Sequence, residues 1–558
     1  MKCINCKKHT VCLYYYNNDK KAPLCDVCIK EIIDVNMCEG FRLWQQAVDY
    51  DQKYHNNAKR RISNLFKEFS ACENLPDMAI MVRDGLICQI KAHLQFYNRD
   101  CLVALCVLMK QRFLAGMDGA SSDFWHSSTE YNVACTIIRY CYEIEEFEGG
   151  MLYESEEPGV FDLITAIVFL RILLVLEENI QICERIGYKQ RTIQELLYEP
   201  IEWKESEKYF EEYVASSRFD KPEDYSFKYH PLELKLRSEH KDMNSIILQA
   251  DKEIEQSFGF NLDVMMNIMM DPMRKVQDTR KGGHQDLYKI VSVSELYKKF
   301  ESISDFKTVE RILDTFTLRK APEDFTDLQT RGFYEIRSIV RLGDQVMMTP
   351  FDMFQCASVF RGYALSGHNI ELYLPNVDTQ INLSSVLNIT STFVVYTMVD
   401  VLKNSGYTLP QEKKKIDGVL YVVPMAEIKK VMKDGVNLLK QDENLIDIDI
   451  LACNESSKII YNIEVKHYKP AVSVKQMLLG DQSKIEGKQT VRKTLARESL
   501  IYREQESFLD FLNVRTDEKY TVKSFIVSSR ANYYAQLCDS VECITWQKFC
   551  ERAKNKTL

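Results

Sequence analysis

The sequence lacks an uninterrupted apolar segment long enough to cross a membrane, which takes about 20 residues. Its most apolar region, 160–176, is broken by Asp162 and Arg171, and its length is typical of a buried core helix. No basic stretch followed by an apolar one lies near residue 1, so a secretion signal is not expected. We therefore expect a cytoplasmic protein without a membrane partner.

A disulfide framework is not expected either. The 18 cysteines are spread over 558 residues without a secretion signal, which favours reduced thiols. Most of them, such as Cys101, Cys106, Cys135 and Cys141, lie among apolar residues and are predicted to be ordinary core residues.

The chain has no overall excess of positive charge, because its formal net charge is −9. Residues 391–558 nevertheless contain 26 Lys and Arg against 22 Asp and Glu, a balance of +4 that leaves −13 for the remainder. This distribution argues against nucleic-acid binding by the whole surface. It permits a polyanionic substrate at the C-terminal part.

The length exceeds what a single hydrophobic core supports, so several domains are expected. We predict a multi-domain α+β protein with a small cysteine-rich module at 1–38 and a mainly α-helical region at 39–385, in which 216–231 is a candidate boundary between two sub-domains. Residues 386–558 show the order helix, two strands, helix, two strands, which predicts an α/β domain.

Two predicted strands of the C-terminal domain carry an unusual set of charged residues. Asp447 and Asp449 alternate with isoleucines in the run 444–452, and Asn462, Glu464 and Lys466 alternate with apolar residues in 458–468. The segment CNESSK between them is a candidate hairpin turn. If the strands pair, three carboxylates and one ammonium share a patch.

Carboxylates this close repel one another and are costly to desolvate, so a bound cation would explain the cluster better than a structural role. Mg²⁺ prefers carboxylate oxygens and keeps water ligands that can attack phosphorus. We expect Asp449 and Glu464 to hold Mg²⁺, Lys466 to position or deprotonate the attacking water, and Asp447 to be auxiliary. The structural alternative is a pair of edge strands whose exposed faces are charged.

Asp449, fourteen intervening residues and then Glu464-Val465-Lys466 resemble the PD-(D/E)xK nuclease superfamily, whose members have the restriction-endonuclease-like fold. The segments EVKHYKPAVSVKQMLLG and VKSFIVSSRANYYAQLCDSVECITWQKFCERAK resemble Mrr-like enzymes, so the resemblance covers roughly 386–558. One departure is that Ile448, not proline, precedes Asp449.

The resemblance implies a Mg²⁺-dependent endonuclease with Asp449, Glu464 and Lys466 as catalytic residues. It implies DNA rather than RNA as the favoured substrate, and a role in restriction or antiviral defence. The glutamate often found on the first helix of this superfamily would correspond to Asp400 or Glu412. The glutamine found beyond the lysine in some members would be Gln476, Gln482 or Gln489.

Two further interactions are expected. Cutting both strands of a duplex usually takes two active sites and this chain has one, so we expect a homo-oligomer. The helical region is the candidate interface, or a surface for another protein partner.

The alternative function is a non-enzymatic scaffold that binds nucleic acid or protein. It would consist of the helical region and of the module at 1–38, which is described next as a zinc finger. Mg²⁺-dependent degradation of nucleic acid distinguishes the nuclease from the scaffold.

The N-terminal module has the spacing of a zinc site. Cys3, Cys6, Cys25 and Cys28 form two C-x₂-C pairs separated by eighteen residues, and four thiolates close a tetrahedral Zn²⁺ site. The residues between the pairs predict a hairpin around 17–19, and the arrangement resembles a treble-clef or zinc-ribbon finger. Such a small module needs a metal to fold, so the zinc is expected to be structural.

We predict one zinc ion per chain in the purified protein, measured by metal analysis. Cys25→Ser should remove it, since a structural site needs all four ligands. Cys12→Ser is the matched control and should retain the metal, because Cys12 lies outside the paired spacing. A metal-free N-terminal module that is nevertheless folded would contradict the prediction.

Overall fold

The computed structural model describes part of the chain. The described residues are 14–15, 21–22, 39–40, 42–44, 46–47, 52–68, 74–117, 124–149, 163–188, 191–199, 201, 225–278, 288–323, 333–334, 336–342, 345–367, 383–440, 447–467, 485, 489–529 and 540–558.

The chain divides into two compact units, each with helices and strands, which agrees with a multi-domain α+β protein. The first unit comprises 1–201, 254–361 and 370–381. The second comprises 202–253, 362–369 and 382–558. It therefore includes the whole of the predicted domain 386–558, together with residues 202–253, 362–369 and 382–385 from the region 39–385.

Helices make up most of the first unit. They are α2 (Gln52–Glu68), α3 (Leu75–Gln95), α4 (Arg99–Met117), α5 (Phe124–Glu143), α6 (Leu163–Ile186), α7 (Ile193–Tyr198), α11 (Leu262–Asp278), α12 (Val293–Phe300) and α13 (Phe306–Phe316). Two more, α10 (Met243–Phe258) and α15 (Pro350–Leu365), contribute residues to both units.

Within the apolar region 160–176, residues 163–176 form the first part of α6 and are mostly buried, which confirms the predicted core helix. Arg171 is compatible with this position because its guanidinium pairs with the buried carboxylate of Glu130. The indole N–H of Trp44 donates a second hydrogen bond to that carboxylate, at 2.7 Å. A buried charge is tolerated when it is paired and hydrogen-bonded in this way.

The sequence did not predict a small antiparallel sheet within the mainly helical region. Its strands are β3 (Lys289–Ser292), β4 (Val340–Leu342) and β5 (Gln345–Met348), with β5 in the centre. At the N-terminus, β1 (Tyr14–Tyr15) pairs antiparallel with β2 (Lys21–Ala22), which confirms the predicted hairpin. The four cysteines predicted to bind zinc lie outside the described residues.

A four-stranded mixed sheet organises the second unit. Its spatial order is β10 (Ile450–Asn454), β11 (Ile459–Lys466), β12 (Thr521–Ser528) and β13 (Glu542–Thr545). The first pair is antiparallel and the other two are parallel. The β10–β11 connection is the predicted hairpin, and the Asn454 side chain accepts hydrogen bonds from the backbone N–H groups of Ser456 and Ser457 within it.

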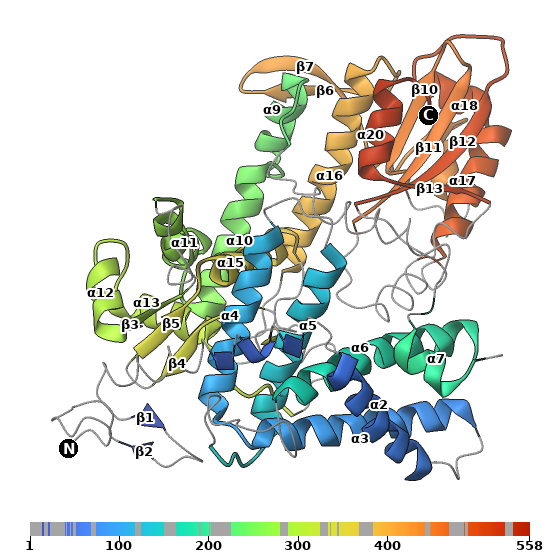
Figure 1. The fold of residues 1–558 in the computed structure, drawn as a ribbon. Helices are drawn as coiled ribbons and strands as arrows, with labels where there is room; N and C mark the ends of the chain where they lie inside the picture. Colours follow the sequence, from blue (N-terminus) through green and yellow to red (C-terminus); the bar gives the residue numbers. More distant parts are fainter. Residues whose placement is uncertain are drawn as a thin grey trace. The chain divides into compact units, whose positions relative to one another are not determined.

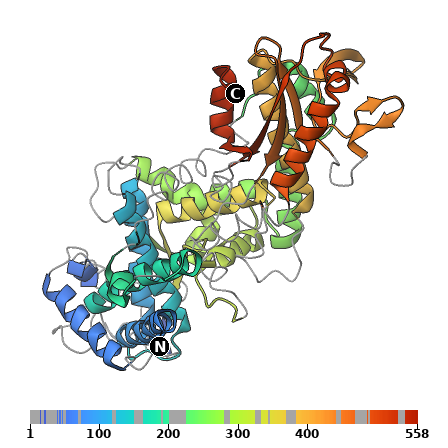
Figure 2. The same cartoon turned by 90° about the vertical axis from the view of Figure 1, so that its right-hand side faces the viewer.

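Helices cover both faces of this sheet (Figures 1 and 2). The crossover between β11 and β12 includes α17 (Thr490–Arg503) and α18 (Gln505–Phe511), and α17 packs on both strands. On the other face lie α16 (Ser384–Asn404) and α20 (Trp546–Lys554), which also contact each other. The predicted order helix, strand pair, helix, strand, strand is found among these elements, and α20 follows at the end. The sequence did not predict two further hairpins, which lie between α16 and β10 within 411–437.

The unit reaches back to residues 202–253 because α9 (His230–Ser238) packs on a second hairpin. That hairpin consists of β6 (Gln411–Ile416) and β7 (Val419–Pro424). Lys235 of α9 pairs with Glu412 of β6, and Lys414 of β6 pairs with Glu239 at 2.6 Å. These contacts join segments that are distant in sequence, which is why a boundary at 386 separates residues that belong together.

Helix α16 is the one described helix that is long and apolar enough to span a membrane by length and composition. In the protein, 72% of its apolar window is buried. Its buried Asp400 accepts hydrogen bonds from the Tyr225 hydroxyl at 2.8 Å and from the backbone N–H of Tyr229 at 2.8 Å. These contacts make α16 a core helix of the second unit.

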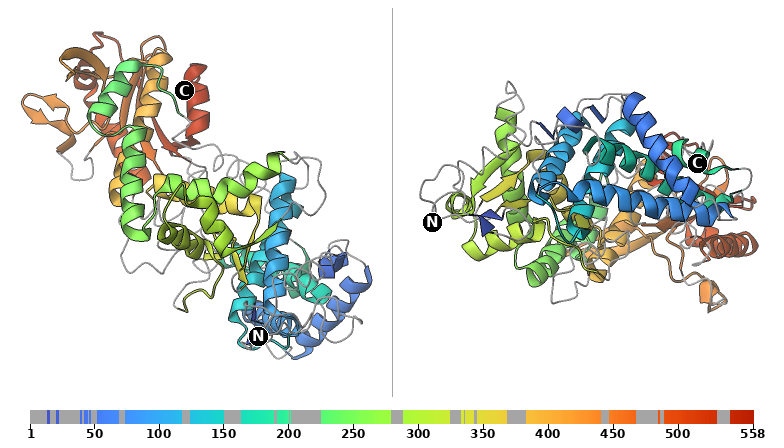
Figure 3. Two further views of the ribbon diagram at one scale, coloured as in Figure 1. Left: turned by 90° about the vertical axis from the view of Figure 1, so that its left-hand side faces the viewer. Right: turned by 60° about the horizontal axis from the view of Figure 1, so that its bottom comes forward.

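A third hairpin, β8 (Met432–Lys433) and β9 (Val436–Asn437), follows β7 and leads into the 3₁₀ turn η5 (Leu438–Lys440). It projects from the body of the unit, in orange in Figures 2 and 3.

Candidate active site

Strand β11 places Asn462, Glu464 and Lys466 on one side of the sheet. The strand is central, since β10 pairs with it on one edge and β12 on the other, so alternate residues share a face. The Asn462 amide donates to the Thr494 carbonyl of α17 at 3.1 Å, and Glu464 pairs with Arg497 of the same helix. The polar face of β11 is therefore the face that α17 covers.

The neighbouring segment does not alternate as the sequence pattern predicts. Strand β10 begins only at Ile450; Ile448 pairs with Ile428 in an isolated bridge, and Asp449 lies in a bend. Ile448 and Leu451 belong to the same apolar cluster, although a regular strand would place residues three apart on opposite faces. The predicted alternation is thus interrupted at the bend, so that Ile448 does not face as predicted, although Asp447 and Asp449 still reach the side of the sheet that carries Glu464.

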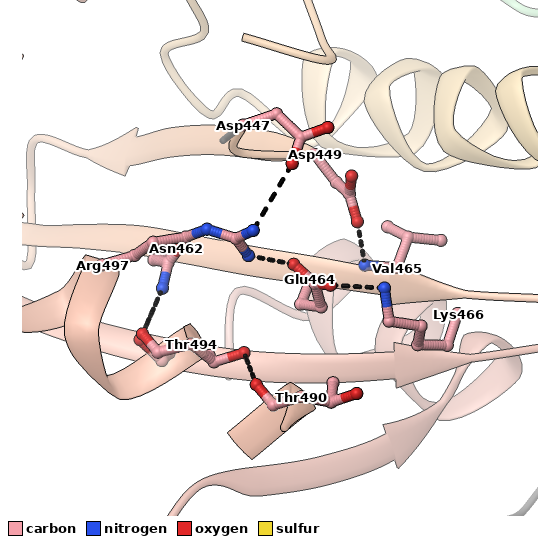
Figure 4. Close-up of polar contacts among 10 residues, drawn as sticks. Asp447, Asp449, Asn462, Glu464, Val465, Lys466, Thr490, Thr494 and Arg497 are labelled. Carbon is pink, nitrogen blue, oxygen red and sulfur yellow. Dashed lines mark hydrogen bonds and ion pairs between the residues drawn. The ribbon is translucent and has the colours of Figure 1, made fainter. Parts of the chain in front are cut away.

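The bend nevertheless brings the Asp449 carboxylate to β11. One of its oxygens accepts a hydrogen bond from the backbone N–H of Val465 at 2.7 Å (Figure 4). The Asp449 carbonyl oxygen accepts another from the backbone N–H of Glu427 at 2.8 Å. Asp449 is thereby held on both sides, with its carboxylate bonded to the residue between Glu464 and Lys466.

The environment of Asp449 raises its pKa to about 7. Burial of the carboxyl is the main cause, and the negative charge of Glu464 adds to it. The Lys466 ammonium and the Val465 N–H act in the opposite direction but do not cancel these effects. A positive ion placed beside Asp449 would offset the unfavourable charge.

Glu464 is only 6% exposed, and cations lie at both of its oxygens. Lys466 pairs with one oxygen and Arg497 with the other (Figure 4). Arg497 also reaches Asp447, at 3.4 Å, so its guanidinium lies between these two carboxylates. The side chain of Lys466 is 29% exposed and that of Arg497 5%, so the lysine has much more room to move.

Arg497 was not recognised in the sequence as a site residue. A signal was present, because Arg497 follows Thr494 by three positions and precedes Leu500 by three, and all three side chains are buried on α17. Positions three apart share a helix face. A charged residue on an otherwise buried face usually has a buried partner.

Two other residues considered for the site are engaged elsewhere. Asp400 is engaged by Tyr225 and Tyr229, and Glu412 by Lys235. Gln489 is exposed and in a left-handed conformation before α17, with no capping hydrogen bond from its side chain. Residues 476 and 482, which carry the other candidate glutamines, lie outside the described part of the chain.

The carboxylates of the candidate site suit a cation that needs only a few ligands from the protein. Within the described residues, no group of three or more His, Cys, Asp or Glu side chains is arranged to hold a metal ion. Asp449 and the Lys466-facing oxygen of Glu464 supply two carboxylate ligands. Mg²⁺ is commonly bound through one or two carboxylates, with waters and substrate phosphates completing its shell, so the two residues fit it.

Comparison with known proteins yields no match, whether with family models, curated proteins or solved structures. A functional proposal for this chain therefore depends on its own residues and their geometry.

Proposed function

We propose that the second unit is a Mg²⁺-dependent nuclease of the PD-(D/E)xK type that hydrolyses phosphodiester bonds, with DNA as the favoured substrate. The observation that carries the proposal is the hydrogen bond from Val465 to the Asp449 carboxylate. It fixes Asp449 to the strand segment that carries Glu464 and Lys466. The sequence resemblance and the mixed sheet with helices on both faces support the same function, and a role in restriction or antiviral defence rests on the resemblance alone.

We assign the three residues different roles on the basis of their surroundings. Asp449 and one oxygen of Glu464 would hold Mg²⁺, which when bound would neutralise charge on the phosphoryl group and supply a nucleophilic water. Lys466 would leave Glu464 when the cation binds there, and its ammonium would then orient the attacking water. Its partial exposure leaves room for this movement.

Arg497 would act as a positioning residue. Its buried guanidinium would stay paired with the second oxygen of Glu464, and it lies between that residue and Asp447. We therefore expect Glu464 to bind metal through a single oxygen and the site to hold one divalent ion.

Arg497→Met is predicted to change metal stoichiometry as well as rate. Loss of the guanidinium leaves Glu464 and Asp447 without their shared cation, so Mn²⁺ binding should rise from one ion per chain towards two in calorimetric titration without nucleic acid. Cleavage should fall by roughly 10- to 100-fold, as is usual when a residue that orients a metal ligand is lost.

Arg492→Met is the matched control, because Arg492 lies on the same helix with an exposed side chain. It should bind one ion and cleave at the wild-type rate. An Arg497→Met protein with one ion and an unchanged rate would rule out the positioning role, and a cooperative thermal transition establishes that it is folded.

The experiment that tests the function itself is a nuclease assay on the purified full chain. Duplex DNA, single-stranded DNA and RNA should be compared with Mg²⁺ and with excess EDTA. Mg²⁺-dependent cleavage that disappears with EDTA supports the proposal. Binding without cleavage of any substrate would favour the non-enzymatic scaffold.

A further inference from the structure

The β8–β9 hairpin is an exposed arm whose base adjoins the candidate site. At that base, Ile428 and Ile448 exchange backbone hydrogen bonds of 2.8 and 2.9 Å. The next bond along the chain joins the Glu427 N–H to the Asp449 carbonyl. The arm therefore starts beside Asp449, so that one extended ligand could contact the candidate site and the arm together.

Buried contacts and hydrogen bonds hold the base of the arm, and a tight turn forms its tip. Val431 and Leu438 are buried in the cluster beneath α17, and the Leu438 N–H donates to the Val431 carbonyl at 2.9 Å. The Asn437 amide bonds the Lys429 carbonyl at 3.0 Å. The tip is Asp434-Gly435, and positive φ angles of 48° and 79° at these residues are typical of the tight turn that matches strand twist.

The surface of the arm combines positive charge with exposed apolar groups. Lys429 and Lys430 are exposed at its base, and no acidic partner is found for them among the described residues. Lys433 is held by Glu504 at 2.8 Å. Nearer the tip, Met432 is 44% exposed and Val436 50% exposed, and neither belongs to the buried cluster that contains Val431 and Leu438.

We infer that this arm binds duplex DNA, a proposal that rests on the proposed nuclease function. Lys429 and Lys430 would contact phosphates, while Met432 and Val436 would enter the groove. The charge of the base is complementary to a polyanion, and a two-stranded β-ribbon fits the major groove of B-form DNA, which is about 12 Å wide. Duplex RNA has a deep, narrow major groove that excludes such a ribbon.

The test measures binding separately from cleavage. In an Asp449→Asn background, fluorescence anisotropy would follow binding of labelled 30-base-pair DNA, RNA duplex of the same sequence, and single-stranded DNA across KCl concentrations. Replacing Lys429 and Lys430 together by Gln should reduce the slope of log K against log salt by about 2, because each phosphate contact contributes roughly 0.9.

Replacing Met432 and Val436 together by Ser should weaken DNA binding without altering the salt slope, since apolar contacts release no counterions. It should also reduce the preference for duplex DNA over duplex RNA. The matched control replaces Lys413 and Lys415 by Gln. These two lysines are exposed on the β6–β7 hairpin, so their loss should leave affinity and slope unchanged.

Unchanged affinity and slope in both arm variants would overturn the inference, as would equal losses in the β6–β7 control. A change in oligomeric state by light scattering, without a change in DNA binding, would identify a second copy of the chain as the occupant instead. Cleavage by the wild-type protein is scored separately. If the wild-type protein cleaves DNA but both arm variants bind DNA normally, only the inference about the arm is refuted. If the arm binds DNA but the protein does not cleave it, only the proposed nuclease function is refuted.

Discussion

Asp449→Asn and Glu464→Gln are each expected to reduce Mg²⁺-dependent cleavage to background. Each change removes one of the two carboxylates that would hold the cation, and two is already a minimal protein ligand set. The measurement is single-turnover cleavage of end-labelled duplex DNA. Amide replacements are preferable to alanine, because glutamine keeps a carbonyl oxygen that accepts a hydrogen bond from Arg497. Alanine would leave the buried guanidinium without that partner, and breaking a buried pair typically costs about 3–5 kcal/mol.

Asp447→Asn is the matched control for these variants. Its carboxylate lies 3.4 Å from Arg497 and is 39% exposed, so it should affect cleavage much less than Asp449. All three proteins should show the same cooperative unfolding. Cleavage by Asp449→Asn at the wild-type rate would refute the nuclease assignment.

Metal binding by the wild-type protein should also depend on pH near 7. The pKa of Asp449 is raised to about 7, so below that pH its carboxyl binds a proton that the cation must displace. Mn²⁺ affinity should therefore fall as the pH falls through 7 and level off above it. The Asp449→Asn protein should lose this dependence, and a wild-type affinity that stays constant from pH 6 to 8 would contradict the role of Asp449.

Lys466→Ala is expected to lower the rate of cleavage by about 10²- to 10⁴-fold, the usual contribution of general-base or water-positioning help. Mn²⁺ binding should be retained or strengthened, because the lysine competes with the cation for an oxygen of Glu464. Single-turnover kinetics and calorimetric titration separate these two effects.

Lys458→Ala is the matched control for Lys466. Lys458 directly precedes β11 at its opposite end, where it pairs with Glu518 at 2.7 Å. It should cleave normally. A Lys466→Ala protein that is as fast as the wild type would exclude the lysine from catalysis, while simultaneous loss of metal binding would show that its role is structural.

The sequence was informative where the chain is regular. Glu464 and Lys466 lie on an eight-residue strand that is hydrogen-bonded on both edges, so alternation alone placed them together. Asp449 lies in a bend just before β10, where regular alternation is interrupted, as the position of Ile448 in the cluster with Leu451 shows. The predicted hairpin turn and the motif spacing both indicated that the two segments would meet, but neither indicated the hydrogen bond from Val465 that holds the Asp449 carboxylate.

Long-range contacts were beyond the sequence pattern. Arg497 contacts Asp447, which lies fifty positions earlier in the sequence. Helical periodicity predicts which side of α17 is buried, but it does not predict which strand that side packs against. The boundary of the second unit was missed for a similar reason, because the pairs Lys235–Glu412 and Tyr225–Asp400 join residues about 175 positions apart. Hydrophobic periodicity describes single elements and contains no information about such partners.

The interrupted path of the second unit has a consequence during protein synthesis. Residues 254–361 and 370–381 belong to the first unit, so helix α9 is made long before the β6–β7 hairpin on which it packs. At synthesis rates of roughly 5–20 residues per second, the delay is on the order of 10 s or more. Strand β12, which flanks the strand of Glu464, emerges later still. A nascent chain on the ribosome therefore has no assembled site, and any cleavage activity would begin only after translation has passed β12.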